Sequence, residues 1–555
     1  MTRFDIDRWI AGWRGPLLAA LVALIAGLPG VFAMPPLDRD ESRFAQATAQ
    51  MLETDDFVNI QFQDQPRHKK PVGIHWLQAA AVSALSSPEA RDIWAYRIPS
   101  LLGAMLAAAA CAWGATAIWG ARAGVLAGVM LGASFLLSTE AFIAKTDAVL
   151  CGTVTLAMAA LARLYLASRG EGISAGRKTK LLFWTAMAVA ILVKGPIGPM
   201  VAGLAMITLG LWDRKWRWLK GLGWGWGLAI VLAVVGPWAV AITVATDGAF
   251  WGTSIGGDMA AKVAGGQEGH GVPPGLHTLL LPLLFYPGTL LLAAAAVTAW
   301  TRRAEPAVRF AIAWFLPAFV VFELVPTKLP HYPLPTYGAI AWLAAAALTQ
   351  PIGPRARWTG VVLACLAVLG VSAVAVGGLT QFGDKSDTFW VSLTVEFAMI
   401  GAFVGAYLLL NRAARTAMVV ACAFGVLAHA ALVGVASSLQ PLQVSPRIEK
   451  ALRKADLDPR EGVVPGPVAV AGYAEPSLVF LLGTRTELLA TGADAIPAVA
   501  QGRPVLIEGR EENSFQQALA QRKLKVRSVD VVEGRNYSNG KRVRLTLYQA
   551  DVARP

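Results

Sequence analysis

Charged residues are scarce in this chain. Asp, Glu, Lys and Arg make up 15% of its 555 residues, whereas 55% are hydrophobic and the mean hydropathy is +0.52. Soluble domains carry about 25% charged residues. A long chain this apolar is not expected to stay dissolved in water. The composition therefore predicts a protein whose solvent is the lipid bilayer.

Cysteine is also sparse, and all four cysteines fall inside apolar segments: Cys111, Cys151, Cys365 and Cys422. None has the CxxC spacing of a structural zinc site, and none lies in a hydrophilic loop where a disulfide would brace the fold. We interpret them as small buried residues.

The net charge of +13 does not indicate nucleic-acid binding, because the basic residues are not gathered in one stripe. They lie in short gaps between apolar segments, each about the length that crosses a bilayer. About thirteen transmembrane helices are predicted, at 16–34, 98–119, 123–138, 146–167, 181–193, 197–212, 224–245, 276–299, 309–325, 334–350, 357–379, 389–411 and 417–438. The break at 194–196 leaves open whether the fifth and sixth are two helices or one.

The charges in the gaps predict the orientation. If the N-terminus is cytoplasmic, the inside gaps hold 19 Lys and Arg against 5 Asp and Glu, as the positive-inside rule requires. The polar segment 1–15 then leads into a retained first helix rather than a removed signal peptide. The outside segments, in the periplasm of a Gram-negative cell, are 35–97, 246–275, 326–335 and 441–555.

Two outside segments are long enough to fold. Segment 35–97 has helical periodicity at 41–53 and 72–85, which suits helices lying in the membrane interface. The tail from Pro441 alternates β-like runs with a helical stretch at 515–522; the runs are 468–471, 477–482, 504–508, 526–532 and 543–548. The predicted fold class is a mainly α, polytopic membrane protein, 1–440, followed by a small α/β domain, 441–555.

Five polar motifs lie on the predicted outer side: Asp40-Glu41, Arg67-His68-Lys69-Lys70-Pro71, Lys145-Thr146-Asp147, Glu268 with His270, and Lys328-Leu329-Pro330-His331-Tyr332. The carboxylates serve either as catalytic groups or as helix caps. The cations bind either a substrate phosphate or lipid head groups. Glu268 and His270 could supply two metal ligands, which are fewer than a metal site needs. Whether a divalent metal serves as a cofactor is therefore left open.

All five motifs are predicted to lie on the outer side of the membrane. This shared location favours chemistry at the membrane surface on a lipid-linked substrate. A transporter or flippase would place charges near mid-membrane, where Glu396 and His429 are the main examples. An oligosaccharide polymerase or ligase is a further alternative. An acidic pair so close to the N-terminus argues against it.

Together these segments resemble a known family. The stretch from Pro36 to Leu77 is similar to the first periplasmic loop of the bacterial lipid A aminoarabinose transferases and of relatives of the protein O-mannosyltransferases. The resemblance extends over 144–150, 193–196, the KLPHYPLP motif at 328–335, and the tail at 536–540 and 545–548. It implies the GT-C fold and a glycosyltransferase that moves a sugar, with inversion, from a polyprenyl (undecaprenyl) phosphate carrier to an envelope acceptor.

The resemblance also implies site residues. Asp40 and Asp147 match the family aspartates, with Glu41 completing the acidic pair; Lys70, Arg43 and Tyr332, with Lys69 and Lys328 beside them, would hold the donor phosphate. Where the family has Glu before its lysine-proline pair, this chain has Lys69, so a carboxylate metal ligand is missing. The implied acceptors are lipid A, other lipopolysaccharide sugars or proteins. The implied location is the bacterial inner membrane, with the active site facing the periplasm.

Overall fold

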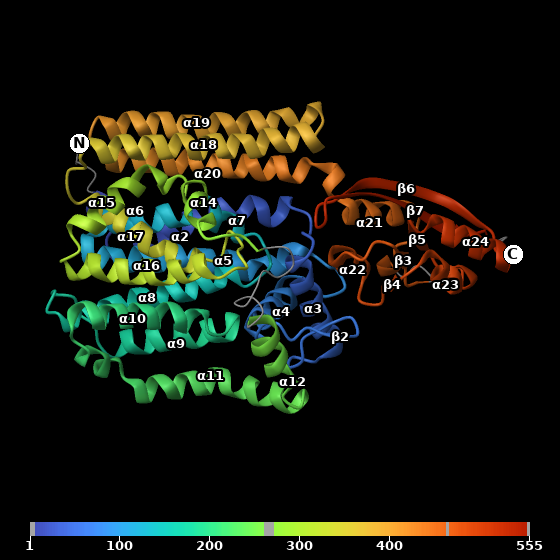
Figure 1. Cartoon of the computed structure of the whole chain (residues 1–555), viewed down its shortest axis with the longest axis horizontal. Helices are drawn as coiled ribbons and strands as arrows, with labels where there is room; N and C mark the ends of the chain where they lie inside the picture. The colour runs from blue at the N-terminus through green and yellow to red at the C-terminus, as the bar shows by residue number, and fades with distance from the viewer. Residues whose placement is uncertain (1–5, 260–270, 462–465, 552–555) are drawn as a thin grey trace.

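The computed structural model describes residues 6–259, 271–461 and 466–551. Figure 1 shows a bundle of helices that run roughly along the long axis of the molecule, with a separate C-terminal domain at one end. We call this end of the bundle the domain end. Helices α3 (Asp40–Thr54) and α4 (Gly73–Leu85) of the first long loop also lie there.

Every apolar segment predicted to cross the membrane coincides with helix. The bundle comprises α2 (Arg14–Ala33), α5 (Ile93–Trp119), α6 (Ala121–Gly132), α7 (Phe135–Glu140), α8 (Asp147–Ser168), α9 (Arg177–Lys194), α10 (Ile197–Asp213), α11 (Trp224–Ala245), α14 (Leu276–Leu284), η3 (Gly288–Leu291), α15 (Leu292–Thr301), α16 (Pro306–Leu324), η4 (Leu334–Thr336), α17 (Tyr337–Ala347), α18 (Pro354–Phe382), α19 (Thr388–Leu410) and α20 (Ala414–Ser438). Short elements flank it: α1 (Ile6–Trp9), η1 (Arg217–Leu222), α12 (Ala249–Trp251), η2 (Gly252–Met259) and η5 (Lys385–Asp387).

Within the ranges that the structure describes, fewer than thirteen helices have the length and apolar composition needed to cross a membrane. Among the described residues, eight helices are long and apolar enough to cross a membrane, or nine if α14 and the segment 288–301, bent by 111°, form one span. Helices α6 and α10 and the segment 334–347 are shorter, and α9 carries four basic residues. The chain is thus a multi-pass membrane protein. The segment 194–196 joins two separate helices, α9 and α10, which lie side by side in Figure 1.

Helix α8 is the most enclosed span. Of its apolar window 89% is buried, against 11% for the peripheral helix α11. Small residues make this possible: a Cβ on Gly103 of α5 would lie 2.6 Å from the backbone of Val149. Close approach of this kind holds membrane helices together where no hydrophobic effect drives them. It fixes the position of Asp147, the first residue of α8.

The first long loop folds into the two predicted helices and a small hairpin, β1 (Gln61–Phe62) with β2 (Gln65–Pro66). Helix α3 is buried on most of its surface, including the polar side chains of Gln46 and Thr48. It packs against α4 and against α22 (Pro476–Leu482) of the C-terminal domain.

The C-terminal domain is a five-stranded mixed sheet of strand order β4-β3-β5-β7-β6. Strand β3 pairs in parallel with β4 and β5, and β7 pairs antiparallel with β5 and β6. The strands are β3 (Ala469–Ala471), β4 (Glu487–Leu489), β5 (Val505–Glu508), β6 (Val526–Asn536) and β7 (Lys541–Ala550). The helices are η6 (Gln440–Leu442), α21 (Val444–Lys454), η7 (Pro459–Glu461), α22, η8 (Gly492–Ala495), α23 (Ile496–Ala500) and α24 (Glu512–Arg522).

One predicted strand is wrong. The run 477–482 forms helix α22 instead, and all seven residues of that helix are buried. A short run that is apolar throughout cannot be assigned to strand or helix by its periodicity. The proline at position 476, the first helical residue, starts the helix because its fixed φ suits that position.

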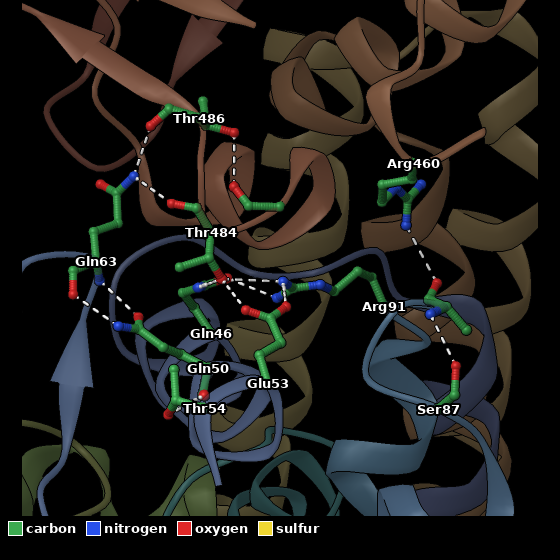
Figure 2. A network of polar contacts seen from close by, with 12 residues as sticks. Gln46, Gln50, Glu53, Thr54, Gln63, Ser87, Arg91, Arg460, Thr484 and Thr486 are labelled. Carbon is green, nitrogen blue, oxygen red and sulfur yellow. Dashed lines mark hydrogen bonds and ion pairs between the residues drawn. The ribbon is translucent and has the colours of Figure 1, made fainter. Parts of the chain in front are cut away.

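The C-terminal domain docks on the first long loop through a polar network, shown in Figure 2. The Arg91 guanidinium pairs with Glu53 of α3 and donates to Gln46, 2.8 Å, and Thr484, 3.2 Å. The Gln63 amide donates to the carbonyls of Thr484 and Thr486. The first long loop therefore rests against residues 393 to 423 positions later in the chain.

Candidate active site

A cluster of buried charges lies at the domain end of α8. The Asp147 carboxylate accepts a hydrogen bond of 2.5 Å from Lys194, the last residue of α9, and lies 3.7 Å from the Lys145 ammonium. The helix N-cap is Thr146, and no side-chain capping bond is formed. The helix-cap interpretation of Asp147 therefore finds no support, and the carboxylate is held by cations instead.

Two further residues complete this cluster. The Lys145 ammonium lies 3.1 Å from Glu140 and donates to His331 Nδ1 at 3.3 Å, while His331 Nε2 lies 3.7 Å from Asp147. Burial lowers the pKa of His331 to about 3, so the imidazole is neutral at physiological pH. With Nδ1 accepting from Lys145, its proton sits on Nε2, toward Asp147.

Asp40, the first residue of α3, is more exposed than the other acids of the site. Reduced hydration by itself would raise its pKa, but the charges of Lys145 and Arg67 outweigh this and hold the pKa below its usual range. Its helix is capped at Arg39 without a side-chain bond. Asp40 is thus an ionised, accessible carboxylate whose pKa responds to the charges of Lys145, Arg67 and Asp147.

Glu41, predicted as a catalytic acid, has a different place. Its side chain is 1% exposed and pairs with Arg97 through two hydrogen bonds of 2.8 Å. The backbone amides of Leu37 and Ala144 donate to the same two oxygens, each at 2.8 Å. A carboxylate with its acceptor positions filled from inside the protein has none left for a substrate. Glu41 instead positions the loop beside Asp40.

Of the predicted phosphate-binding residues, some lie at the charge cluster and others are bound to the protein's own backbone. Tyr332 lies in the cluster, with the Lys194 ammonium 5.6 Å from the centre of its ring. The Lys328 ammonium is buried and donates to the carbonyls of Val272 and Val325, so it joins two backbone segments. Arg43 is half-buried one turn after Asp40 on α3.

The basic segment is anchored beside the cluster by Gly73. A Cβ on this glycine would lie 2.6 Å from the carbonyl oxygen of Leu192, two residues before Lys194. Lys70, three residues before Gly73, is half-buried, and Lys69 is exposed.

Glu268 and His270, the proposed metal ligands, lie outside the described residues. Within the described part of the chain, no three His, Cys, Asp or Glu side chains are grouped as a metal site would need.

Sequence reasoning assigned no site role to three members of the cluster. Glu140 was not singled out, although an acid beside an apolar segment is a signal in itself. Lys194 was noted only within the helix break and the family resemblance at 193–196, and His331 only as part of the polar motif at 328–332. Their convergence depends on the packing of α7, α8 and α9 with the segment between α16 and η4, which no local pattern contains.

The comparisons with known proteins agree with this fold. The profile of the dolichyl-phosphate-mannose-protein mannosyltransferase family matches residues 12–250. An undecaprenyl phosphate-alpha-4-amino-4-deoxy-L-arabinose arabinosyl transferase of Pseudomonas paraeruginosa is 28% identical over 392 residues, 68% of this chain and 69% of the relative. The enzyme of that name from Yersinia pestis is 27% identical over 341 residues, 60% of this chain and 59% of the relative.

Solved structures show the same architecture. ArnT from Cupriavidus metallidurans bound to undecaprenyl phosphate superposes with a TM-score of 0.74 at 22% identity, covering 96% of this chain and 97% of that one. An Archaeoglobus fulgidus oligosaccharyltransferase gives a TM-score of 0.51 at 11% identity, covering 94% and 70%.

The fold is that of the GT-C glycosyltransferases. The chain is a membrane glycosyltransferase related to the undecaprenyl-phosphate-aminoarabinose arabinosyl transferases and to the protein mannosyltransferases.

Proposed function

We propose that this chain transfers a sugar from an undecaprenyl phosphate carrier to an envelope acceptor such as lipid A, with inversion at the sugar carbon. The observation that carries the proposal is the cluster itself. Asp40 and Asp147 lie close to Lys145 and Lys194 at one end of an apolar bundle, and Lys70 is three residues before Gly73, which packs against the end of α9. This is where a lipid-borne phosphate would meet protein charge. The relatives named above carry the donor in their names.

The chemistry requires few steps. An oxygen of the acceptor attacks the anomeric carbon, the bond from that carbon to the phosphate oxygen breaks, and its electron pair leaves with the polyprenyl phosphate. Lys70, Arg43 and the hydroxyl of Tyr332 stabilise the charge that develops there. If the acceptor is a hydroxyl, Asp40 takes its proton. If it is an ionised phosphate, no proton is removed, and Asp40 stabilises positive charge on the sugar.

We further propose that the N-terminus is cytoplasmic and that the site and the C-terminal domain face the periplasm from the inner membrane, with the domain boundary near residue 440. The excess of 19 Lys and Arg over 5 Asp and Glu in the inside gaps supports this orientation. Protease added to spheroplasts should then remove the tail 441–555. Cleavage of that tail only in inside-out vesicles would reverse the orientation.

A direct assay tests the transfer. The purified chain is incubated with undecaprenyl phosphate sugars and lipid A, and both free undecaprenyl phosphate and modified lipid A are measured by mass spectrometry. A transferase produces the two in equal amounts, whereas a flippase produces neither.

Replacing Lys70 with alanine should abolish product while the protein remains folded, because a charge-assisted contact to the leaving phosphate is lost. Lys178→Ala, an exposed lysine at the start of α9, is the matched control. Full activity of the Lys70 variant would remove this residue from the site.

A further inference from the structure

A second basic site lies outside the charge cluster, where the C-terminal domain meets the bundle. It is a groove of about 860 Å³ between the ends of α18 and η6 and the outer face of the β6–β7 hairpin. Four arginines line it, Arg510, Arg535, Arg542 and Arg544, against two carboxylates, those of Glu508 and Glu533. The groove therefore has an excess of positive charge that the catalytic proposal does not use.

Strand alternation builds this basic face. Val543 and Leu545 of β7 point into the domain core, so Arg542 and Arg544 point out. Across the ladder, Arg535 pairs in register with Arg542 and so joins the same outward face. The outward direction of these arginine side chains is therefore set by the sheet and not by a flexible loop.

The arginines differ in their partners. Arg510 forms an ion pair with Glu508 at 2.5 Å, and Arg544 lies 3.4 Å from Glu533. For Arg535 and Arg542, no ion pair with a carboxylate is found among the described residues. Arg535 stacks on Phe382 instead, 5.6 Å from the ring centre. Two guanidinium groups thus remain available for an anion.

The groove lies at the level of the membrane surface. Phe382 is the last residue of the apolar span α18, and Pro441 follows α20 by three residues. At the start of the next span, Phe389 and Trp390 are 60% and 39% exposed, as aromatic residues of membrane interfaces are. A head group in the lipid leaflet at this end would meet the arginines directly.

We propose that this groove binds the head-group phosphate of an anionic membrane lipid, with Arg535 and Arg542 as its principal ligands. Guanidinium groups bind phosphate through paired hydrogen bonds. The lipid is either the phosphorylated acceptor or an anionic phospholipid of the membrane, and both present the same phosphate chemistry. The site does not depend on the transfer reaction proposed above.

The groove is close to the catalytic loop along the hairpin. Ser538, three residues beyond Arg535, accepts a hydrogen bond from Arg39, which precedes Asp40. Strand β6 ends at Asn536 and Ser538 lies in the turn that follows, and three residues of chain span at most about 10 Å. The groove therefore lies within a short length of chain of the turn that contacts the loop before Asp40.

Lipid binding to the full-length protein in a neutral detergent tests the proposal. Native mass spectrometry compares phosphatidylglycerol with phosphatidylcholine of the same acyl chains. The wild type should retain phosphatidylglycerol preferentially, and Arg535→Gln/Arg542→Gln should weaken that binding at least about ten-fold, since each arginine near a lipid surface contributes about 1 kcal/mol. Arg527→Gln, at the other end of β6, is the matched control and should bind as wild type.

Diphosphoryl lipid A in the same titration identifies the source of the phosphate. Binding at least ten-fold tighter than phosphatidylglycerol, lost in the double variant, assigns the groove to the acceptor; equal binding assigns it to anionic phospholipids. Phosphatidylglycerol binding by the double variant equal to that of the Arg527 control overturns the proposal. The single variant Arg542→Glu applies the same criterion if the double variant does not fold. Because no turnover is measured, these outcomes are independent of the transferase assay.

Discussion

The Arg39 guanidinium donates a hydrogen bond of 2.7 Å to the carbonyl oxygen of Ser538, 499 residues further along the chain. Arg39 itself has φ +63° and ψ −111°, a conformation that costs a non-glycine residue about 1–3 kcal/mol. Beside it, the backbone amide of Asp38 donates to the Tyr537 hydroxyl at 2.6 Å. The turn between β6 and β7 thus holds the two residues before Asp40 in their unusual path.

Variants of Arg39 should show whether the turn restrains this part of the loop. Arg39→Ala removes the hydrogen bond and keeps the strained φ, so amide exchange across residues 36–44 should be faster than in the wild type. Arg39→Gly also removes the bond but relieves the strain, and should exchange more slowly than the alanine variant. Hydrogen–deuterium exchange measures both. An alanine variant that exchanges as slowly as the wild type would show that the turn does not hold the loop.

Docking of the C-terminal domain should depend on pH through Asp38. Burial, and next the charge of Glu475, raise the pKa of Asp38 to about 7; Ser477 and Arg39 act in the opposite direction, and Tyr473 and Tyr537 are the other titratable groups that face it. A carboxyl with a higher pKa when docked takes up a proton on docking. Its contribution is complete below about pH 4 and is lost as the pH rises through about 7.

The measurement for Asp38 is the exchange rate of residues 36–44 at pH 5.5 and pH 7.5, corrected for the intrinsic effect of pH. Protection should be greater at the lower pH. Asp38→Asn, which mimics the protonated form, should remove the difference. The same pH response in the asparagine variant would assign it to another group.

The buried pair of Arg97 and Glu41 should matter for stability. Arg97 also donates to the carbonyls of Val31, at 3.0 Å, and Met34, at 2.6 Å, so it ties the end of α2 to α3. Arg97→Ala leaves Glu41 as an uncompensated buried charge and should cost about 3–5 kcal/mol. Thermal unfolding in detergent measures this.

The exposed pair of Arg122 and Asp7 provides the comparison for that experiment. Its side chains are 50% and 55% exposed, so Arg122→Ala should cost no more than about 1 kcal/mol. Equal losses in the two alanine variants would contradict the structural role assigned to Arg97.

Asp40 and Asp147 should act as one unit in turnover. Asparagine keeps the shape of each side chain and removes its charge, and each single variant should lower turnover by about 10²-fold or more. The double variant should be little worse than the poorer single one, because groups that work together share one loss. The transfer assay described above gives the rates. Two asparagine variants with near wild-type turnover would exclude a catalytic role for both acids.

The bundle could be predicted from sequence because a bilayer demands long apolar helices, which hydropathy reveals directly. The helices of the first loop followed from their periodicity. Strands β5 and β7 were predicted to within about two residues of their observed bounds, whereas β6 extends four residues further and α24 begins three residues earlier than predicted. The helix at 477–482 could not be predicted, since its residues are buried on every side and show no alternation.

The site was only partly predictable for a different reason. Asp147 stands out as an acid at the start of an apolar helix, whereas Glu140 and Lys194 reach it only through packing between helices. Glu41 and Lys328 had the right chemistry for the site, but their partners are an arginine and backbone carbonyls far along the chain. Local sequence shows which type of side chain is present, but it does not show which atoms that side chain contacts.

The hydrogen bonds that join the first loop to the last hairpin have a consequence for the synthesis of the protein. Residues 38 and 39 leave the ribosome almost 500 residues before Tyr537 and Ser538. At about 5–20 residues per second, the delay is roughly 25–100 s. Throughout that interval the growing chain lacks the contacts that shape the loop before Asp40. A copy that is interrupted after residue 331 but before the final hairpin is translated therefore carries every residue of the cluster and still lacks the finished loop.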